Sequence, residues 1–364
     1  MTVKDITKIL EEIAPLATAE DFDNVGLLVG QYSMPVIGVL ITLDALEEVV
    51  DEAIEKNCNL IVSFHPIIFD GLKKLNGNTY VERVVIKAIA HKIAIYSMHT
   101  ALDNSNRGVN AKICEVLDLM EPKILIPKKG ALKKLTTYAP LKDAPMVKEA
   151  LFAAGAGEIG NYSHCSYSLE GLGSFKAGNG AKPTLGKIGE LHHERETQIN
   201  VIYPLDREKN ILNALFATHP YEEVAHEVFT LENAYQNLGM GMIGTLEGEL
   251  DEKEFLLRVK DRMGAAVVRH SRLLHKKVKK VAVLGGSGAF AIPAAIKAGA
   301  DVLVTSDIKY HQFFQAEDRL VIADIGHFET ERFTKDLLHA HLTKKIPNFA
   351  VVLSERITNP INYL

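Results

Sequence analysis

A histidine and a glutamate four residues apart follow an apolar run near the end of the chain. The run 321–325 is typical of a buried strand that ends at Gly326. His327 and Glu331 come next, where a helix is expected to begin. Residues at this spacing share one helix face, so the imidazole and the carboxylate can reach a single point. Mixed nitrogen and oxygen donors suit Zn, Mn or Fe. From these residues alone, a solvated surface pair is the competing interpretation.

Other histidines and carboxylates occur at equivalent places along the chain. His65 lies near the end of one apolar run, and His99 and Asp103 close another. Asp307 and His311 follow a third run near the C-terminus. Open α/β sheets bind their ligands at the carboxyl ends of strands, so these groups are candidates for one shared site. Each has a structural alternative: a strand-end histidine bonded to the backbone, or a satisfied surface histidine for His311.

Strands and helices alternate at both ends of the chain, which indicates mostly parallel sheets covered on both faces. The last third repeats the order of the first, with polar residues at matching strand ends. We therefore expect an α/β fold of two related α/β/α lobes that face each other and share a site. The expected strands are 36–43, 60–69, 93–97, 280–284, 301–306 and 319–325, and the expected helices are 3–14, 45–56, 80–91, 108–119 and 289–298.

The middle of the chain has a different pattern. Its order of strand, helix, two strands, helix and strand is close to the ferredoxin-like arrangement of an inserted α+β domain. The glycine-dense stretch 237–244 is interpreted as an exit hinge or tight turn. The predicted domains are an N-terminal α/β lobe at 1–126, an insert at 127–237 and a C-terminal α/β lobe at 238–364.

Composition excludes several classes of protein. The 364 residues exceed one typical domain, and 47% hydrophobic and 24% charged residues are ordinary for a globular protein with a full core. The net charge of -5, without a long basic block, argues against a nucleic-acid partner. Three scattered cysteines and the lack of a signal peptide or a long apolar run predict a cytoplasmic protein that is not bound to a membrane.

Five motifs carry a resemblance to a known family, and they span both predicted lobes in the expected order. They are residues 22–30, 63–69, 99–103, 285–288 and 326–331. The chain resembles the NIF-three-like proteins, also called the GTP cyclohydrolase I type 2 family. The middle segment, including residues 217–225, looks like the CutA- or PII-like domain that longer bacterial members insert between their lobes. The resemblance covers nearly the whole chain.

The resemblance implies a toroidal homohexamer with two divalent metal ions (Zn, Mn or Fe) per subunit, held between the lobes. Carried over motif by motif, the family's ligands fall on His65, Asp103, His327 and Glu331. Many members have a second histidine at the position of Phe64. This departure leaves one ion with fewer protein ligands.

The expected function is a dinuclear metal-dependent hydrolase of the GTP cyclohydrolase 1 type 2 kind, in which a metal-bound water attacks a nucleotide-like substrate. His99 and His311 are the candidate catalytic groups beside the metal ligands. The alternative is a non-catalytic hexameric metal-binding scaffold, or a metal chaperone or regulator. Two smaller questions stay open: whether the 285–288 turn cradles a phosphate, and whether His219 and Glu222 of the insert bind a ligand or are structural.

Overall fold

The computed structural model describes residues 1–364 and divides the chain into two units. One unit contains residues 1–128 together with 236–364, and the other contains residues 129–235. The helices are all too short or too polar to span a lipid bilayer. The predicted division into three domains at 126/127 and 237/238 stays a prediction.

The first sheet of the larger unit has the strand order β1-β4-β3-β2-β15. Its strands are β1 (Gly26–Val29), β2 (Val39–Thr42), β3 (Leu60–Ser63), β4 (Ala94–Ser97) and β15 (Val351–Leu353). The pairs β15–β2, β2–β3 and β3–β4 are parallel, and β1 is antiparallel to β4. The central strands are short apolar runs buried on both faces, as parallel strands between helix layers require.

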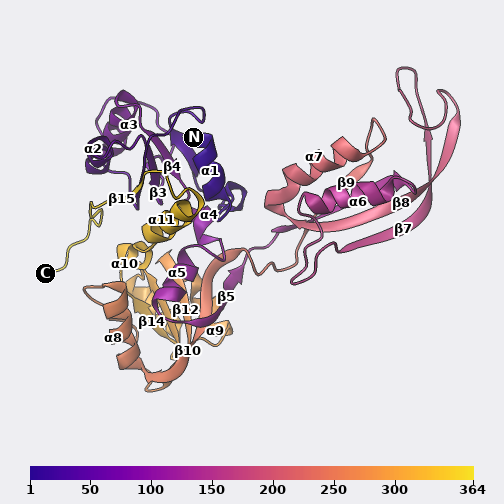
Figure 1. The fold of residues 1–364 in the computed structure, drawn as a ribbon. Helices are drawn as coiled ribbons and strands as arrows, with labels where there is room; N and C mark the ends of the chain where they lie inside the picture. The colour runs from indigo at the N-terminus through magenta and orange to yellow at the C-terminus, as the bar shows by residue number, and fades with distance from the viewer. The chain divides into compact units, whose positions relative to one another are not determined.

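Helices cover both faces of this sheet (Figure 1). The helices α2 (Glu47–Glu55) and α3 (Tyr80–Ala90) pack on one face, and α1 (Val3–Glu11) and α11 (Thr334–Lys345) lie on the other. In α1, buried apolar residues recur at a spacing of three to four, and Thr2 and Asp5 form a capping box at its start. The structure therefore confirms the amphipathic helix expected at residues 3–14.

The second sheet has the order β11-β14-β13-β12-β10-β5. Its strands are β5 (Met120–Pro127), β10 (Gly239–Asp251), β11 (Arg269–His270), β12 (Lys277–Ser287), β13 (Val302–Ser306) and β14 (Val321–Asp324). The strands β12, β13 and β14 are parallel neighbours. The helices α5 (Val109–Val116) and α8 (Glu252–Met263) pack on one face, and α9 (Ile292–Lys297) packs on the other.

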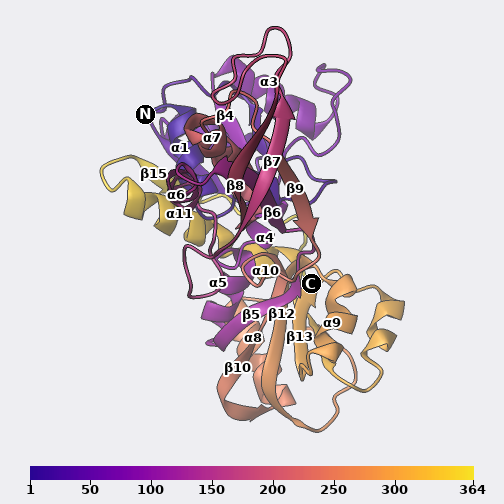
Figure 2. The ribbon, with the colours of Figure 1, turned by 90° about the vertical axis from the view of Figure 1, so that its right-hand side faces the viewer.

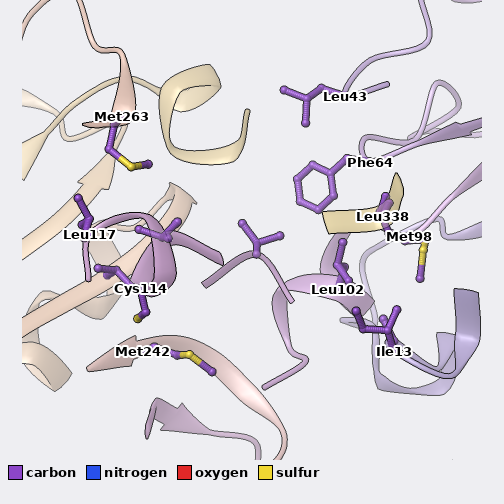
Figure 3. Packing of buried hydrophobic residues seen from close by; sticks show 14 of the residues in the cluster. Ile13, Leu43, Phe64, Met98, Leu102, Cys114, Leu117, Met242, Met263 and Leu338 are labelled. Atoms are coloured by element: carbon purple, nitrogen blue, oxygen red, sulfur yellow. The ribbon is translucent and has the colours of Figure 1, made fainter. Parts of the chain in front are cut away.

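Each of these two sheets includes one strand from the part of the chain that forms most of the other sheet. The strand β5 precedes residue 129 but pairs in the second sheet, whereas β15, near the C-terminus, pairs with β2 in the first. One continuous core joins both sheets: it runs from Leu43, Phe64 and Leu338 to Cys114 and Met263, as Figure 3 shows. Because this core is shared, the groups at the strand ends of the two sheets are held within one compact unit.

The exit hinge or tight turn expected at 237–244 is only partly found: residues 236–237 form a turn, but residues 239–244 belong to the 13-residue strand β10, which pairs with both β5 and β12. The glycines serve close approach instead. A Cβ on Gly239 would collide with the carbonyl oxygen of Ile126, and one on Gly244 would lie 3.0 Å from Leu119 Cβ. The high glycine content of this stretch therefore reflects the close approach of neighbouring segments to the strand.

The smaller unit has the chain order β6, α6, β7, β8, α7, β9 and forms one antiparallel sheet in the order β7-β8-β6-β9 (Figure 2). The elements are β6 (Leu132–Pro140), α6 (Ala144–Ala153), β7 (Ser166–Lys176), β8 (Leu191–Pro204), α7 (Glu208–Thr218) and β9 (His226–Leu231). This is the ferredoxin-like strand order. The first of the two strands expected between the helices is the 11-residue strand β7.

Short helical turns complete the chain and position several strand ends. They are η1 (Leu16–Thr18), α4 (His99–Asp103), η2 (Leu205–Arg207), η3 (Ala289–Ala291), η4 (Tyr310–Ala316) and α10 (His327–Glu331).

Candidate metal centre

Both sheets contribute side chains to one cluster at the carboxyl ends of their parallel strands. His65 follows β3, and Asp103 is the last residue of α4, which follows β4. His327 and Glu331 are the first and last residues of α10, which follows β14. Gly326 has φ = 101°, a left-handed conformation that lets the chain turn sharply from strand to helix. The i,i+4 spacing thus places His327 and Glu331 on one face of a helical turn, as predicted.

Three donors converge in this cluster. The Nε2 atoms of His65 and His327 each lie 3.1 Å from Glu331 Oε2. One ligand atom from each of the three residues lies within 4.8 Å of the others. The Glu331 side chain is only 4% exposed, so its Oε2 atom contacts the two imidazoles rather than solvent. Two imidazole nitrogens and a carboxylate in this arrangement form a possible metal-binding triad.

Asp103 adds a carboxylate oxygen that has no partner. Its Oδ1 atom is buried and has no hydrogen-bond partner. Burial, together with the nearby charge of Glu331, raises the pKa of Asp103 well above its usual value. Asp103 lines a cavity of about 200 Å³ together with His99, His327 and Glu331. A buried carboxylate beside another carboxylate is costly unless a cation neutralises it, so the residues present fit a divalent metal ion.

Each imidazole near the cluster is held by a carboxylate at Nδ1. His65 Nδ1 lies 2.8 Å from Asp44 Oδ1, and His327 Nδ1 lies 2.7 Å from Asp307 Oδ2. This contact fixes the ring and leaves Nε2 directed at the cluster.

The pKa values of the two histidines reflect this environment. Burial lowers the pKa of His65, but its contacts with Asp44 and Glu331 outweigh burial and raise it to about 10. The pKa of His327 rises to about 9, because Glu331 and Asp307 outweigh its burial in the same way. Burial raises the pKa of Glu331, but the two imidazoles lower it to about 2. A bound metal would compete with protons for the Nε2 atoms.

His99 lies beside the cluster, whereas His311 does not. The His99 ring centroid is 5.4 Å from that of His65, and its Nδ1 atom lies 2.8 Å from Asp23 Oδ1. His99 also has φ = 25°, an uncommon value for a residue with a side chain. His311 is exposed, packs against Tyr310 and is absent from the cavity lining. A catalytic role for either histidine stays a prediction.

The side chain at position 64 belongs to the core. Phe64 is completely buried, and its ring centroid lies 4.9 Å from that of His65 and 5.6 Å from that of His99. It packs beneath these imidazoles and offers no donor to an ion.

The turn at 285–288 uses its N–H groups within the protein. Gly285 N–H donates to Asn110 Oδ1 and Gly286 N–H donates to Thr330 Oγ1. This arrangement favours the tight-turn interpretation over a phosphate cradle. In the smaller unit, His219 Nε2 contacts the carbonyl oxygen of Tyr138 and its Nδ1 accepts from the Tyr221 N–H, which favours a structural role there.

Sequence reasoning gave no role to Asp44 or to Asp23. A usable signal for Asp44 was present. In the parallel pair β2–β3, Thr42 pairs with Ser63, so Asp44 and His65 each lie two residues beyond paired positions. Equal offsets on neighbouring parallel strands bring two side chains together at one edge of the sheet.

The fold and the cluster define a class: an α/β protein whose larger unit has a candidate metal centre where the strand ends of its two sheets meet. The model of the Duf34/NIF3 (NGG1p interacting factor 3) family matches residues 1–360, and the chain belongs to this family.

Relatives and solved structures agree with this assignment. A Bacillus subtilis relative named "GTP cyclohydrolase 1 type 2 homolog" is 40% identical, over 99% of this chain and 98% of its own length. The crystal structure of a Bacillus cereus protein related to NIF3 superposes with a TM-score of 0.85 at 37% identity and covers 100% of this chain and 99% of that chain. A Staphylococcus aureus protein of 29% identity gives a TM-score of 0.78 and covers 100% of this chain and 99% of that chain.

Proposed function

We propose that this chain is a metal-dependent hydrolase of the GTP cyclohydrolase 1 type 2 kind that acts on a nucleotide-like substrate and holds two divalent ions (Zn, Mn or Fe). The observation that carries the proposal is the convergence of two Nε2 atoms on Glu331 Oε2, beside an unpartnered carboxylate of Asp103. His65, His327, Glu331 and Asp103 are the proposed ligands. The name shared by the relatives supports the reaction class.

The proposed chemistry divides between the ions and the protein. When bound, two divalent ions lower the pKa of water and supply a nucleophile at neutral pH. The protein contributes the negative charge of Glu331 and Asp103, and it orients two imidazoles through Asp44 and Asp307. His99 is tied to Asp23 at Nδ1, which leaves Nε2 to accept or donate a proton beside the cluster.

The cavity rim supports a substrate with a flat ring. Phe22 and Phe290 line the same cavity as Glu331, although they are 67% and 55% exposed. Large aromatic side chains left exposed beside polar groups are suited to stacking on a planar base. A nucleotide-like substrate would place its ring on this rim and its reacting atom near the carboxylates.

For the assembly, we propose a toroidal homohexamer in which residues 129–235 serve as a CutA- or PII-like insert. Family membership and the ferredoxin-like strand order of this unit support the proposal. The second candidate function is a non-catalytic metal-binding scaffold. The fully buried Phe64 favours it, because this side chain stands where many members have another histidine.

The test is metal content by mass spectrometry together with a GTP-hydrolysis and ring-opening assay. The wild type is compared with His327→Ala and with His193→Ala, a control that removes an exposed histidine from β8. About two ions per chain, lost with activity only in His327→Ala, supports the hydrolase. Metal without turnover of any nucleotide supports the scaffold. Absence of bound metal after addition of Zn, Mn and Fe overturns both.

A further inference from the structure

A hydroxyl from the C-terminal segment reaches the back of the metal centre. Thr358 Oγ1 donates to Asp44 Oδ2 at 2.5 Å, and the other oxygen of Asp44 lies 2.8 Å from His65 Nδ1. Thr358 is only 6% exposed although it lies in no helix or strand. A relay of hydroxyl, carboxylate and imidazole therefore runs from residue 358 to the candidate ligand His65.

The segment that carries Thr358, residues 354–363, is called the C-terminal strap here. It is attached at both ends of its path. Glu52 accepts hydrogen bonds from the Ser354 hydroxyl at 2.5 Å and from the Glu355 N–H at 2.8 Å. Further along, Asn359 Nδ2 donates to Glu329 Oε1 on α10 at 3.3 Å. The strap thus contacts the first sheet's helix layer through Glu52 and the ligand-bearing helix α10 through Glu329.

The second sheet contains the same relay, built from regular strands. Ser287 ends β12 and its hydroxyl contacts Asp307 Oδ2, and Asp307 holds His327 Nδ1. The strands β12, β13 and β14 are parallel neighbours, so hydroxyl, carboxylate and imidazole come from three successive strand ends. In the first sheet β15, β2 and β3 are also parallel neighbours, and Thr358 follows β15 as Ser287 ends β12.

We propose that the C-terminal strap is a positioning element for the metal centre and that Thr358 is its positioning residue, acting on His65 through Asp44. This inference rests on the proposed metal-binding function. The strap completes in the first sheet the support that β12 provides in the second. Thr358 itself touches neither ion nor substrate.

Exposure explains why the relay needs this hydroxyl. The Asp44 and His65 side chains are 31% and 25% exposed, so water competes for the carboxylate. Without Thr358 Oγ1, the Asp44 carboxylate is free to rotate toward solvent and to release the Nδ1 atom of His65. The ring would then visit orientations in which Nε2 no longer points at Glu331.

The test compares Thr358→Val, which removes the hydroxyl while keeping the shape, with Thr358→Ser, which keeps the hydroxyl. Thr7→Val is the matched control, because Thr7 is 2% exposed and its hydroxyl donates only to the Lys4 carbonyl of its own helix. Zn²⁺ affinity is measured by competition with a chromophoric chelator. We expect Thr358→Val to weaken binding about tenfold to 100-fold, the usual effect of removing an outer support of a ligand. Thr358→Ser and Thr7→Val should bind as the wild type does.

A second readout needs neither metal nor activity. In the metal-free proteins, the ¹⁵N signals of the His65 and His327 rings report their tautomers and proton exchange. Thr358→Val should change the His65 signals and leave those of His327 unchanged.

The outcomes distinguish a failure of the strap proposal from a failure of the proposed metal-binding function. The proposed role of the strap is overturned if Thr358→Val leaves the His65 signals unchanged. It is also overturned if Thr358→Val leaves the Zn²⁺ affinity unchanged while the wild type binds Zn²⁺. A wild type that binds no metal while Thr358→Val still alters the His65 ring overturns the proposed function but retains the positioning role on the imidazole.

Discussion

Replacing Asp103 with asparagine should raise the stability of the metal-free protein and abolish its response to metal. Asp103 Oδ1 is buried without a hydrogen-bond partner, and the charge of Glu331 lies nearby. Asparagine has nearly the same shape but carries no charge. A residue retained for structure would behave in the opposite way, because its loss would break existing contacts.

The magnitudes follow from the two effects. An unsatisfied buried polar group costs about 1–3 kcal/mol, of which the Asp103→Asn substitution would recover roughly 1 kcal/mol because the amide is still polar. For a unit of this size that is a rise in Tm of about 2–4 °C. Metal at about 100 times its Kd stabilises the wild type by about 2.7 kcal/mol, and the variant should lose most of this gain. The order of the two Tm values should therefore reverse when metal is added.

The assay is calorimetric unfolding of wild type and Asp103→Asn in chelator and in excess Zn²⁺ or Mn²⁺. Asp261→Asn, which changes an exposed carboxylate on α8, is the control and should follow the wild type in both buffers. A metal-free Asp103→Asn protein that melts several degrees below the wild type would refute the reasoning. Equal stabilisation of both proteins by metal would exclude Asp103 as a ligand.

Three further predictions address the surroundings of the site. Burial raises the pKa of Glu52, but hydrogen bonds from the C-terminal strap and from Lys56 outweigh it and hold the pKa below its usual 4.5. Ionised Glu52 therefore stabilises the protein above that pH, so Glu52→Gln should cost about 1–3 kcal/mol at pH 7, and the difference in Tm from wild type should vanish as pH falls through the lowered pKa. Gly286→Ala should lower the free energy of unfolding by about 1 kcal/mol or more and reduce the amount of bound metal. Gly286 has φ = 71°, and a Cβ there would lie 2.5 Å from Glu331 Oε1. Metal content per chain and the free energy of unfolding test this prediction. Phe22→Ala should raise KM for a nucleotide about tenfold with metal content unchanged, and an unaltered KM would remove Phe22 from the substrate rim.

Local spacing was sufficient to place one pair of side chains together, although it left open whether the pair binds a metal or is a solvated surface pair. The pair His327 and Glu331 was predicted from four-residue spacing because helix geometry alone brings such side chains together. His65 and Asp103 were different, because nothing local says that two strand ends of separate sheets meet. The family resemblance placed them, and the shared core of the two sheets now supplies the physical reason for the proximity of His65.

Non-local pairing also explains what sequence reasoning missed. The strand β15 is three residues long and pairs with β2, which lies near the opposite end of the chain. No period within a short window announces that pairing, so the strap and Thr358 had no expected role. The strand at the glycine-dense start of β10 was missed for a related reason. Its glycines allow the close approach of Leu119 and Ile126 on a neighbouring segment, whereas glycines most often indicate a turn.

The two halves of the site are alike in how they hold an imidazole but differ in the carboxylates they add. Glu331 lies four residues after His327 and reaches both imidazoles, whereas the residue four places after His65 is Phe69. The first half instead contributes Asp103, the last residue of α4, which follows the neighbouring strand β4. Glu331 is shared between the two halves of the site, whereas Asp103 comes from the first half alone. This difference predicts two unequal metal sites, because an ion at the triad would receive two imidazoles and a carboxylate. A second ion would depend on Asp103 and on sharing Glu331, so metal titration should show one tight and one weaker step.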